Sequence, residues 1–427
     1  MGGSRLLGRR KSSAVARRAE PLLMPWSSLL NPKTIVEAVI VLIAGSLVGT
    51  LYFDHVGRVT GRISDIPLHI DLLVKSRETS LQLGYTIYYQ MLDLVSGGAA
   101  DRGELTSAAA LILGVSMGLR LTLLFLLVIL ARQTTWLSVL VAVCVTVAAP
   151  LTLPGTDPMY LGKFSPSVWH NSTTILALPL CLALFVAVVK VLSCLNVSTL
   201  LYLSVPVLTI VCGAAKPNYL LALGPAVAIW CVVQVVIQPR GDRASTFRRL
   251  LARVSPLALA AVATLGYQYL ATFGGSGITI LGQVVTNQVR PMAVWRLLTP
   301  NPAWALVASF LWPALATGLL NRRTLSVGLA WLVAVCGVVE FVLLAEVLSP
   351  SGSTLGHANW IWGAHMATFV LYAVVAQQVA AQWHLLSRAR WVLLALGLYQ
   401  TLLGVRIVVR FWAGEAPTRM IGGWLFF

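Results

Sequence analysis

Long apolar runs divide this sequence, and they constrain its fold more than any other feature. A helix needs about 20 apolar residues to cross the hydrocarbon core of a bilayer. We expect eleven transmembrane helices, at about residues 34–54, 107–131, 135–150, 172–190, 198–215, 218–237, 254–272, 303–320, 325–347, 360–382 and 391–409. The chain is 58% hydrophobic and only 11% charged, a composition that suits lipid rather than a single water-soluble core. The sequence therefore predicts an all-α polytopic membrane protein.

Charged residues predict how the chain is oriented. Basic residues outnumber acidic ones 31 to 14. Because they lie mostly in short connections, they indicate membrane topology and contact with lipid headgroups rather than nucleic acid. With the N-terminus in the cytoplasm, the cytoplasmic segments carry 18 of the 31 basic residues, as the positive-inside rule requires. We expect a multi-pass protein of the cytoplasmic (inner) membrane, with a basic cytoplasmic tail at 1–33, a transmembrane domain at 34–409 and a C-terminal tail at 410–427.

The first apolar run has the features of a signal anchor. It follows the basic tail and ends at Asp54 and His55, without the small-residue site at which a signal peptide is cleaved. We therefore expect the first span to be retained.

Three long connections lie outside in this orientation, at residues 55–106, 151–171 and 273–302. The cytoplasmic side has no comparable folded segment, so any chemistry is expected to face outward. In the first connection, "SDIPLHIDLLVKSRETS" and "GYTIYYQMLDLV" carry apolar residues at helical spacing. They predict two short interfacial helices. The glycine-rich third connection is expected to form a flexible lid or a re-entrant segment.

Asp65 stands at the start of the first interfacial helix, and two interpretations compete for it. Asp before Pro at a helix start is an ordinary N-cap. A carboxylate at the bilayer surface is also placed to remove a proton from a sugar hydroxyl. His69, one turn later, is either a snorkelling interfacial residue or a partner for a phosphate.

Four motifs carry a resemblance to known proteins: "SDIPLH", "KFSPSVWHNSTT", "KPNYLLALGPA" and "GHANWIWG" resemble those of bacterial polytopic proteins of surface-polysaccharide assembly. The early outer carboxylate followed by an interfacial helix pair resembles the membrane-embedded GT-C glycosyltransferases. The resemblance implies that Asp65 is the base or a metal and acceptor contact, with Asp157 or Asp71 as a second acidic residue. It also implies a polyprenyl-phosphate-linked sugar donor and a lipid-linked or cell-envelope glycan acceptor. Some members use a divalent metal, Mg²⁺ or Mn²⁺, for which this sequence offers only scattered ligands.

Polar residues near the outer face suit such a donor, because a leaving phosphate develops negative charge that cations stabilise. Lys163 and His170 lie in the second outer connection. Asn171 is expected to cap the next helix, whose N-terminus adds a positive dipole end. Lys216 lies in a tight turn between two spans, and Arg290 lies in the third connection. Taken singly, each also fits a snorkelling side chain, a helix cap or a solvated loop.

The segment that opens the tenth span holds His357, Asn359 and Trp360. An aromatic ring there stacks on a sugar or belongs to the interfacial aromatic belt. The six cysteines lack paired metal-type spacing and are expected to be small core residues. Arg120 and Glu340 lie inside spans, where each is costly unless it is paired or wetted, and a pair between them is one solution.

Two other functions remain open. A polysaccharide polymerase or ligase uses the same lipid substrates but relies on arginine and histidine in a large outer loop. A transporter or lipid-linked sugar flippase requires polar residues along a path through the membrane midplane. The early carboxylate and the polar groups at one membrane face favour the glycosyltransferase.

Overall fold

The computed structural model describes residues 31–59, 64–79, 86–131, 133–152, 162–194, 196–273, 279–280, 283–320, 324–349, 351–352 and 359–415. The helices are α2 (Pro32–Arg58), α3 (Ile66–Thr79), α4 (Thr86–Val95), α5 (Arg102–Ile129), α6 (Thr135–Val147), α7 (Ser172–Ser193), α8 (Thr199–Ala215), α9 (Asn218–Val236), α10 (Arg243–Phe273), α11 (Ala293–Leu298), α12 (Pro302–Leu319), α13 (Leu325–Leu343), α14 (Ile361–Ala381) and α15 (Ala389–Trp412). The strands are β1 (Thr279–Ile280), β2 (Gln283–Val289) and β3 (Leu344–Ser349), and short 3-10 turns cover Arg240–Asp242 and Trp383–Leu385.

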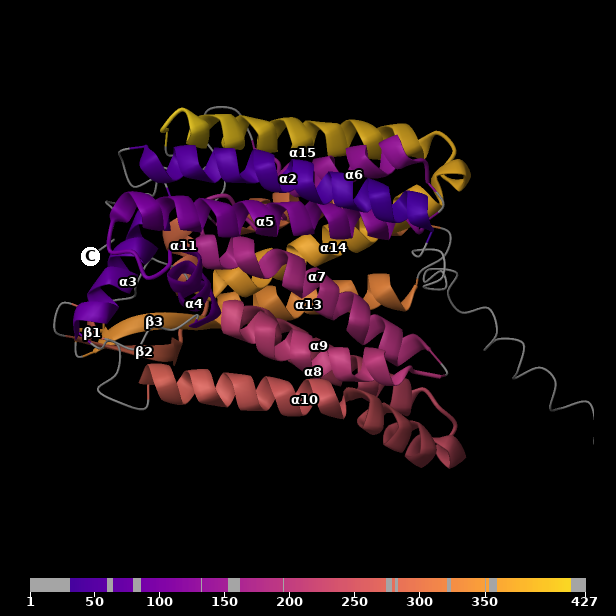
Figure 1. The fold of residues 1–427 in the computed structure, drawn as a ribbon. Coiled ribbons are helices and arrows are strands. Elements are labelled where there is room, and N and C mark those ends of the chain that lie inside the picture. The colour runs from indigo at the N-terminus through magenta and orange to yellow at the C-terminus, as the bar shows by residue number, and fades with distance from the viewer. Residues whose placement is uncertain are drawn as a thin grey trace, which may run out of the picture.

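The helices form the bundle of an α-helical multi-pass membrane protein (Figure 1). Within the described residues, nine helices are long and apolar enough to cross a membrane, and α6 and α8 are shorter apolar helices. The 13 residues of α6 span only about 20 Å at 1.5 Å per residue, short of a bilayer core of about 30 Å. Each predicted run coincides with one helix, but the count of eleven crossings stays a prediction.

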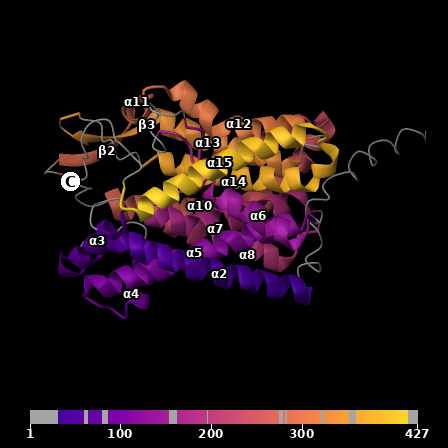
Figure 2. The same cartoon turned by 90° about the horizontal axis from the view of Figure 1, so that it is seen from above.

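The bundle has a clear centre and periphery. In the most apolar 18-residue stretch of α14, 94% is buried inside the protein, against 11% in the corresponding stretch of α2. The centre of the bundle is therefore α14, with α7 beside it (Figure 2). On the periphery α2 packs closely on α5, because Gly49 faces Gly114 and leaves no room for a side chain on either helix. Small residues allow such close approach between membrane helices.

The predicted first-connection helices are present as α3 and α4. The spacing predicted which residues face inward: α3 buries Ile66, Ile70 and Leu73, and α4 buries Tyr88 and Leu92. Both helices lie at the same end of the bundle as the three strands (Figure 1). That they lie on a membrane surface stays a prediction.

The third connection differs from the expected lid or re-entrant segment. Its described part forms strands β1 and β2 and helix α11. The two strands join β3 in an antiparallel sheet of order β1-β2-β3, with Thr286 opposite Val347 and Val289 opposite Leu344. The span expected at 325–347 accordingly ends as helix at Leu343 and continues as strand. Helical periodicity could not predict strand β3, because its hydrogen bonds are to β2, a segment distant in the sequence. The glycines at 274, 275 and 277 lie outside the described residues.

Candidate functional site

The carboxylate of Asp65 joins two helix ends. Asp65 precedes α3, as an N-cap would, but its side chain bonds to a different helix. Oδ1 accepts hydrogen bonds from the Ser172 backbone N–H at 2.8 Å and from the Ser172 hydroxyl at 2.7 Å. The Asp65 backbone N–H donates to the carbonyl of His170 at 2.9 Å. Asp65 therefore fastens the start of α3 to the N-terminus of α7, 107 positions away in the sequence.

A chain of polar contacts extends from the second oxygen of Asp65. His69 Nε2 lies 3.2 Å from Asp65 Oδ2, and His69 Nδ1 lies 2.6 Å from the hydroxyl of Tyr89. Both His69 and Tyr89 are buried. The two helices of the first connection thus jointly hold one side of the Asp65 carboxylate.

Asp65 is held in its ionised form. Burial by itself would raise the pKa of this carboxyl, but the His69 imidazole and the two hydrogen bonds from Ser172 outweigh it and bring the pKa below its usual value. The side chain keeps 13% of its surface exposed. It is therefore a carboxylate at neutral pH with limited access to other molecules.

Lys216 approaches the same helix end from the other side. It follows α8, and its ammonium donates to the Thr173 hydroxyl at 2.9 Å and to Asn171 Oδ1 at 3.3 Å. The ammonium also lies 5.4 Å from the ring centre of Trp362, at the start of α14. Burial lowers the pKa of Lys216 to about 7, against the opposing effect of the negative charges on Asp65 and Glu346. A buried lysine with a pKa lowered by burial and with specific charged neighbours is a candidate functional group.

Asn171 is the N-cap of α7, as predicted. Its Oδ1 accepts from the Thr174 backbone N–H at 3.0 Å and from the Thr174 hydroxyl at 2.6 Å, in addition to the bond from Lys216. Lys216 is thereby coupled directly to the positive end of the α7 dipole.

His170 lies between aromatic rings. It stacks on Phe411 with ring centres 6.1 Å apart and contacts Trp362 at 5.4 Å. Burial lowers its pKa to about 4, assisted by Lys216 and opposed by Asp65. A neutral imidazole cannot supply the positive charge expected of His170 beside a phosphate, although it remains able to form a hydrogen bond.

The start of α14 brings in Asn359. Its amide donates to both carboxylate oxygens of Glu346 in β3, at 3.1 and 3.0 Å. The Asn218 amide, at the start of α9, donates to the Asn359 carbonyl at 3.1 Å. Trp360 is partly buried beside it. Three helix N-termini, those of α7, α9 and α14, therefore meet in one region.

The remaining predicted residues have other partners or lie elsewhere. Lys163 is fully buried and donates to the carbonyl of Leu151 at 2.9 Å, which joins two parts of the second connection. Arg290 donates to the carbonyl of Gly352 at 2.7 Å. Asp71 pairs on the surface with Arg102. His357 and Asp157 lie outside the described residues.

Three residues of this region were not singled out from the sequence: Ser172, Thr173 and Glu346. Ser172 and Thr173 follow a predicted cap, which was the available signal. Glu346 gave none, because it was assigned to the end of a span. Among the described residues, no group of three or more His, Cys, Asp or Glu side chains is placed to hold a metal ion.

The chain matches no protein-family model, no curated protein and no solved structure. The likeness to GT-C glycosyltransferases stays a prediction.

Proposed function

We propose that the protein is a membrane glycosyltransferase that transfers a sugar from a polyprenyl-phosphate donor to a lipid-linked or cell-envelope glycan acceptor. One observation carries the proposal. The partly buried carboxylate of Asp65 and the buried ammonium of Lys216 both bond to the N-terminus of α7, at Ser172 and at Thr173. Inverting sugar transfer needs such a pair, one group to accept a proton and one to stabilise a leaving phosphate.

The carboxylate acts as the base in this proposal. Asp65 is ionised at neutral pH, and its hydrogen bonds fix its orientation before the acceptor arrives. The acceptor hydroxyl gives its proton to Asp65 as its oxygen bonds to the anomeric carbon of the sugar. General-base assistance of this kind contributes roughly 10²–10⁴-fold to a rate.

The leaving phosphate is stabilised on the other side of Ser172. Lys216 supplies an ammonium there, and the N-termini of α7, α9 and α14 add positive dipole ends. An arriving phosphate also favours the protonated form of Lys216, so donor binding itself completes the cationic site. Asn359 and Trp360 remain the proposed contacts for the sugar, and His69, Lys163, Arg290 and His357 remain proposed contacts for the donor phosphate.

The proposed location is the outer face of the cytoplasmic membrane. The described parts of the first and second connections meet through Asp65 and His170, as they must if both lie on one side. The excess of basic residues in the opposite connections favours that side as the outer one.

The test is sugar transfer by the purified protein in detergent. Wild type and Asp65→Asn are compared for transfer from a panel of polyprenyl-phosphate sugars to an extract of lipid-linked acceptors. Asp71→Asn is the matched control, because that carboxylate is exposed and pairs with Arg102. Loss of transfer in Asp65→Asn alone, with an unchanged melting temperature, supports the proposal. Full transfer by Asp65→Asn removes Asp65 from the chemistry.

A lipid-linked sugar flippase is the second candidate, and one observation favours it. The central helix α14 carries fully buried polar side chains along its length, at His365, Thr368, Gln377 and Gln378. A transport path requires polar groups through the membrane midplane. Movement of a labelled polyprenyl-phosphate sugar across proteoliposomes, without sugar transfer, would establish the flippase instead.

A further inference from the structure

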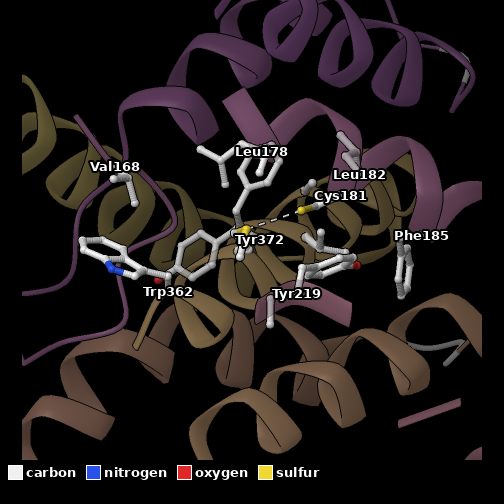
Figure 3. Packing of buried hydrophobic residues seen from close by; sticks show 14 of the residues in the cluster. Val168, Leu178, Cys181, Leu182, Phe185, Tyr219, Trp362 and Tyr372 are labelled. Atoms are coloured by element: carbon white, nitrogen blue, oxygen red, sulfur yellow. Dashed lines mark hydrogen bonds between the residues drawn. The ribbon is translucent and has the colours of Figure 1, made fainter. Parts of the chain in front are cut away.

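Three sulfur-containing side chains from three different helices meet in the core. The Sγ atoms of Cys181 in α7 and Cys212 in α8 lie 3.6 Å apart, and Cys181 Sγ lies 3.6 Å from Met366 Sδ in α14. All three side chains have no exposed surface. Figure 3 draws Cys181 among the buried residues Leu178, Tyr219 and Tyr372, with a dashed line at its sulfur.

The three sulfurs form a set of soft ligands. Thiolates and thioethers are soft ligands that suit monovalent copper and zinc, and they do not suit calcium or magnesium. A structural zinc site takes four ligands, commonly cysteine and histidine. Among the described residues, no histidine or carboxylate joins these cysteines in a group of three or more. The composition of the set thus favours an ion that accepts three sulfur ligands.

The spacing of the sulfurs suits a shared ion. Metal–thiolate bonds in proteins are about 2.3 Å long. An ion at that distance from both members of a pair fits between sulfurs that are 3.6 Å apart.

Charge also favours a monovalent ion. An isolated charge in a low-dielectric interior is costly. A monovalent ion with one thiolate, one thiol and one thioether has no net charge. Binding then releases a single proton from a cysteine.

The three sulfurs lie about one helical turn from Lys216 and Trp362. Cys212 in α8 precedes Lys216, which follows that helix, by one helical turn. Met366 follows Trp362 by one turn in α14, and one such turn corresponds to about 6 Å along a helix. The buried hydroxyl of Tyr219, a residue drawn near Cys181 in Figure 3, has no hydrogen-bond partner among the described residues. A polar group without a partner thus stands beside the set.

We propose that Cys181, Cys212 and Met366 form a binding site for one monovalent soft metal ion, Cu(I). The site lies outside the Asp65 and Lys216 region and is independent of the proposed sugar transfer. Without a bound copper ion, the same residues pack as apolar side chains, as cysteine and methionine commonly do.

The test is anaerobic titration of the reduced, purified full-length protein with Cu(I) in competition with a chromogenic Cu(I) chelator. The reference protein carries alanine in place of the four other cysteines, Cys144, Cys194, Cys231 and Cys336. We expect this protein to bind one equivalent, with an ultraviolet thiolate-to-copper band and three sulfur neighbours by X-ray absorption. Cys181→Ala and Met366→Leu, made in the reference protein, should each weaken binding at least 10-fold.

Two results overturn the proposal. One is a reference protein that binds no Cu(I) in competition with the chelator. The other is binding that Met366→Leu and Cys181→Ala leave unchanged. Met366→Leu conserves volume and should fold, and melting curves check every variant. Before titration, a separate aliquot is denatured, alkylated and weighed by mass spectrometry to verify that the two thiols are reduced. This excludes a disulfide as the cause of absent binding.

Discussion

Replacing Lys216 by Met separates the function of this residue from its effect on stability. Methionine is also a long unbranched side chain and keeps an apolar stem in the same slot, but it carries no charge. Lowering the pKa of a lysine from 10.5 to about 7 means that the charged form costs roughly 5 kcal/mol in the folded protein, at 1.36 kcal/mol per pKa unit. The variant should therefore be more stable than wild type near neutral pH, while losing transfer and phosphate binding.

The dependence of this stability gap on pH has a definite sign. Lysine in the unfolded chain holds its proton up to about pH 10.5, whereas folded Lys216 releases it near pH 7. Between these values the unfolded state binds more protons, so the free energy of unfolding of wild type rises with pH. Below about pH 7 both states are protonated, and the full cost is present. The advantage of Lys216→Met should thus be largest near pH 6 and nearly gone by about pH 10.

Melting temperatures of wild type and Lys216→Met in detergent, measured from about pH 6 to pH 10, test this reasoning. Lys75→Met is the control, because Lys75 is an exposed lysine on α3, and its variant should show no such gap. A soluble prenyl-phosphate analogue should raise the melting temperature of wild type and not that of Lys216→Met. A variant less stable than wild type at pH 6, or a gap independent of pH, would refute the argument that Lys216 is a strained, functional cation.

Three further predictions concern other residues. Because the pKa of His170 is lowered to about 4, wild-type stability should fall as the pH drops from about 6.5 to 4, where only the unfolded state gains a proton. In His170→Phe the melting temperature should depend less on pH over that range. Gly114→Ala should destabilise the protein by several kcal/mol, since its Cβ would lie 2.1 Å from Thr50 Oγ1, whereas Gly266→Ala has nothing within 4 Å and should be neutral or stabilising in the same melting assay. Glu340→Gln should raise the melting temperature at neutral pH, because both buried oxygens of Glu340 lack a hydrogen-bond partner within the described residues, and an amide avoids the few kcal/mol that burying or neutralising a carboxylate costs on folding; an unchanged or lower value would point to a partner for this side chain.

The sequence could not predict which groups lie beside the buried charges of Glu340 and Arg120. Both were recognised as costly inside spans, and a pair between them was one expected solution. Arg120 instead donates to the Thr146 carbonyl at 3.0 Å and lies 5.4 Å from the ring centre of Trp169. Composition identifies a buried charge, but only packing decides which group lies opposite it.

By itself, the sequence predicted the helices that coincide with the eleven apolar runs, the two short helices after the first span and the cap at Asn171. It also singled out Asp65 and Lys216 as polar groups near helix ends. These features depend on runs, spacing and caps within one or a few turns, so they can be read locally. Only the tertiary structure decided that Asp65 bonds to Ser172, 107 positions away, and that the sulfurs of Cys181 and Met366, 185 positions apart, come into contact. It also decided that the chain changes from helix α13 to strand β3, which pairs with β2. Those contacts arise from how the helices pack around α14, and packing partners have no periodic signature in a single sequence.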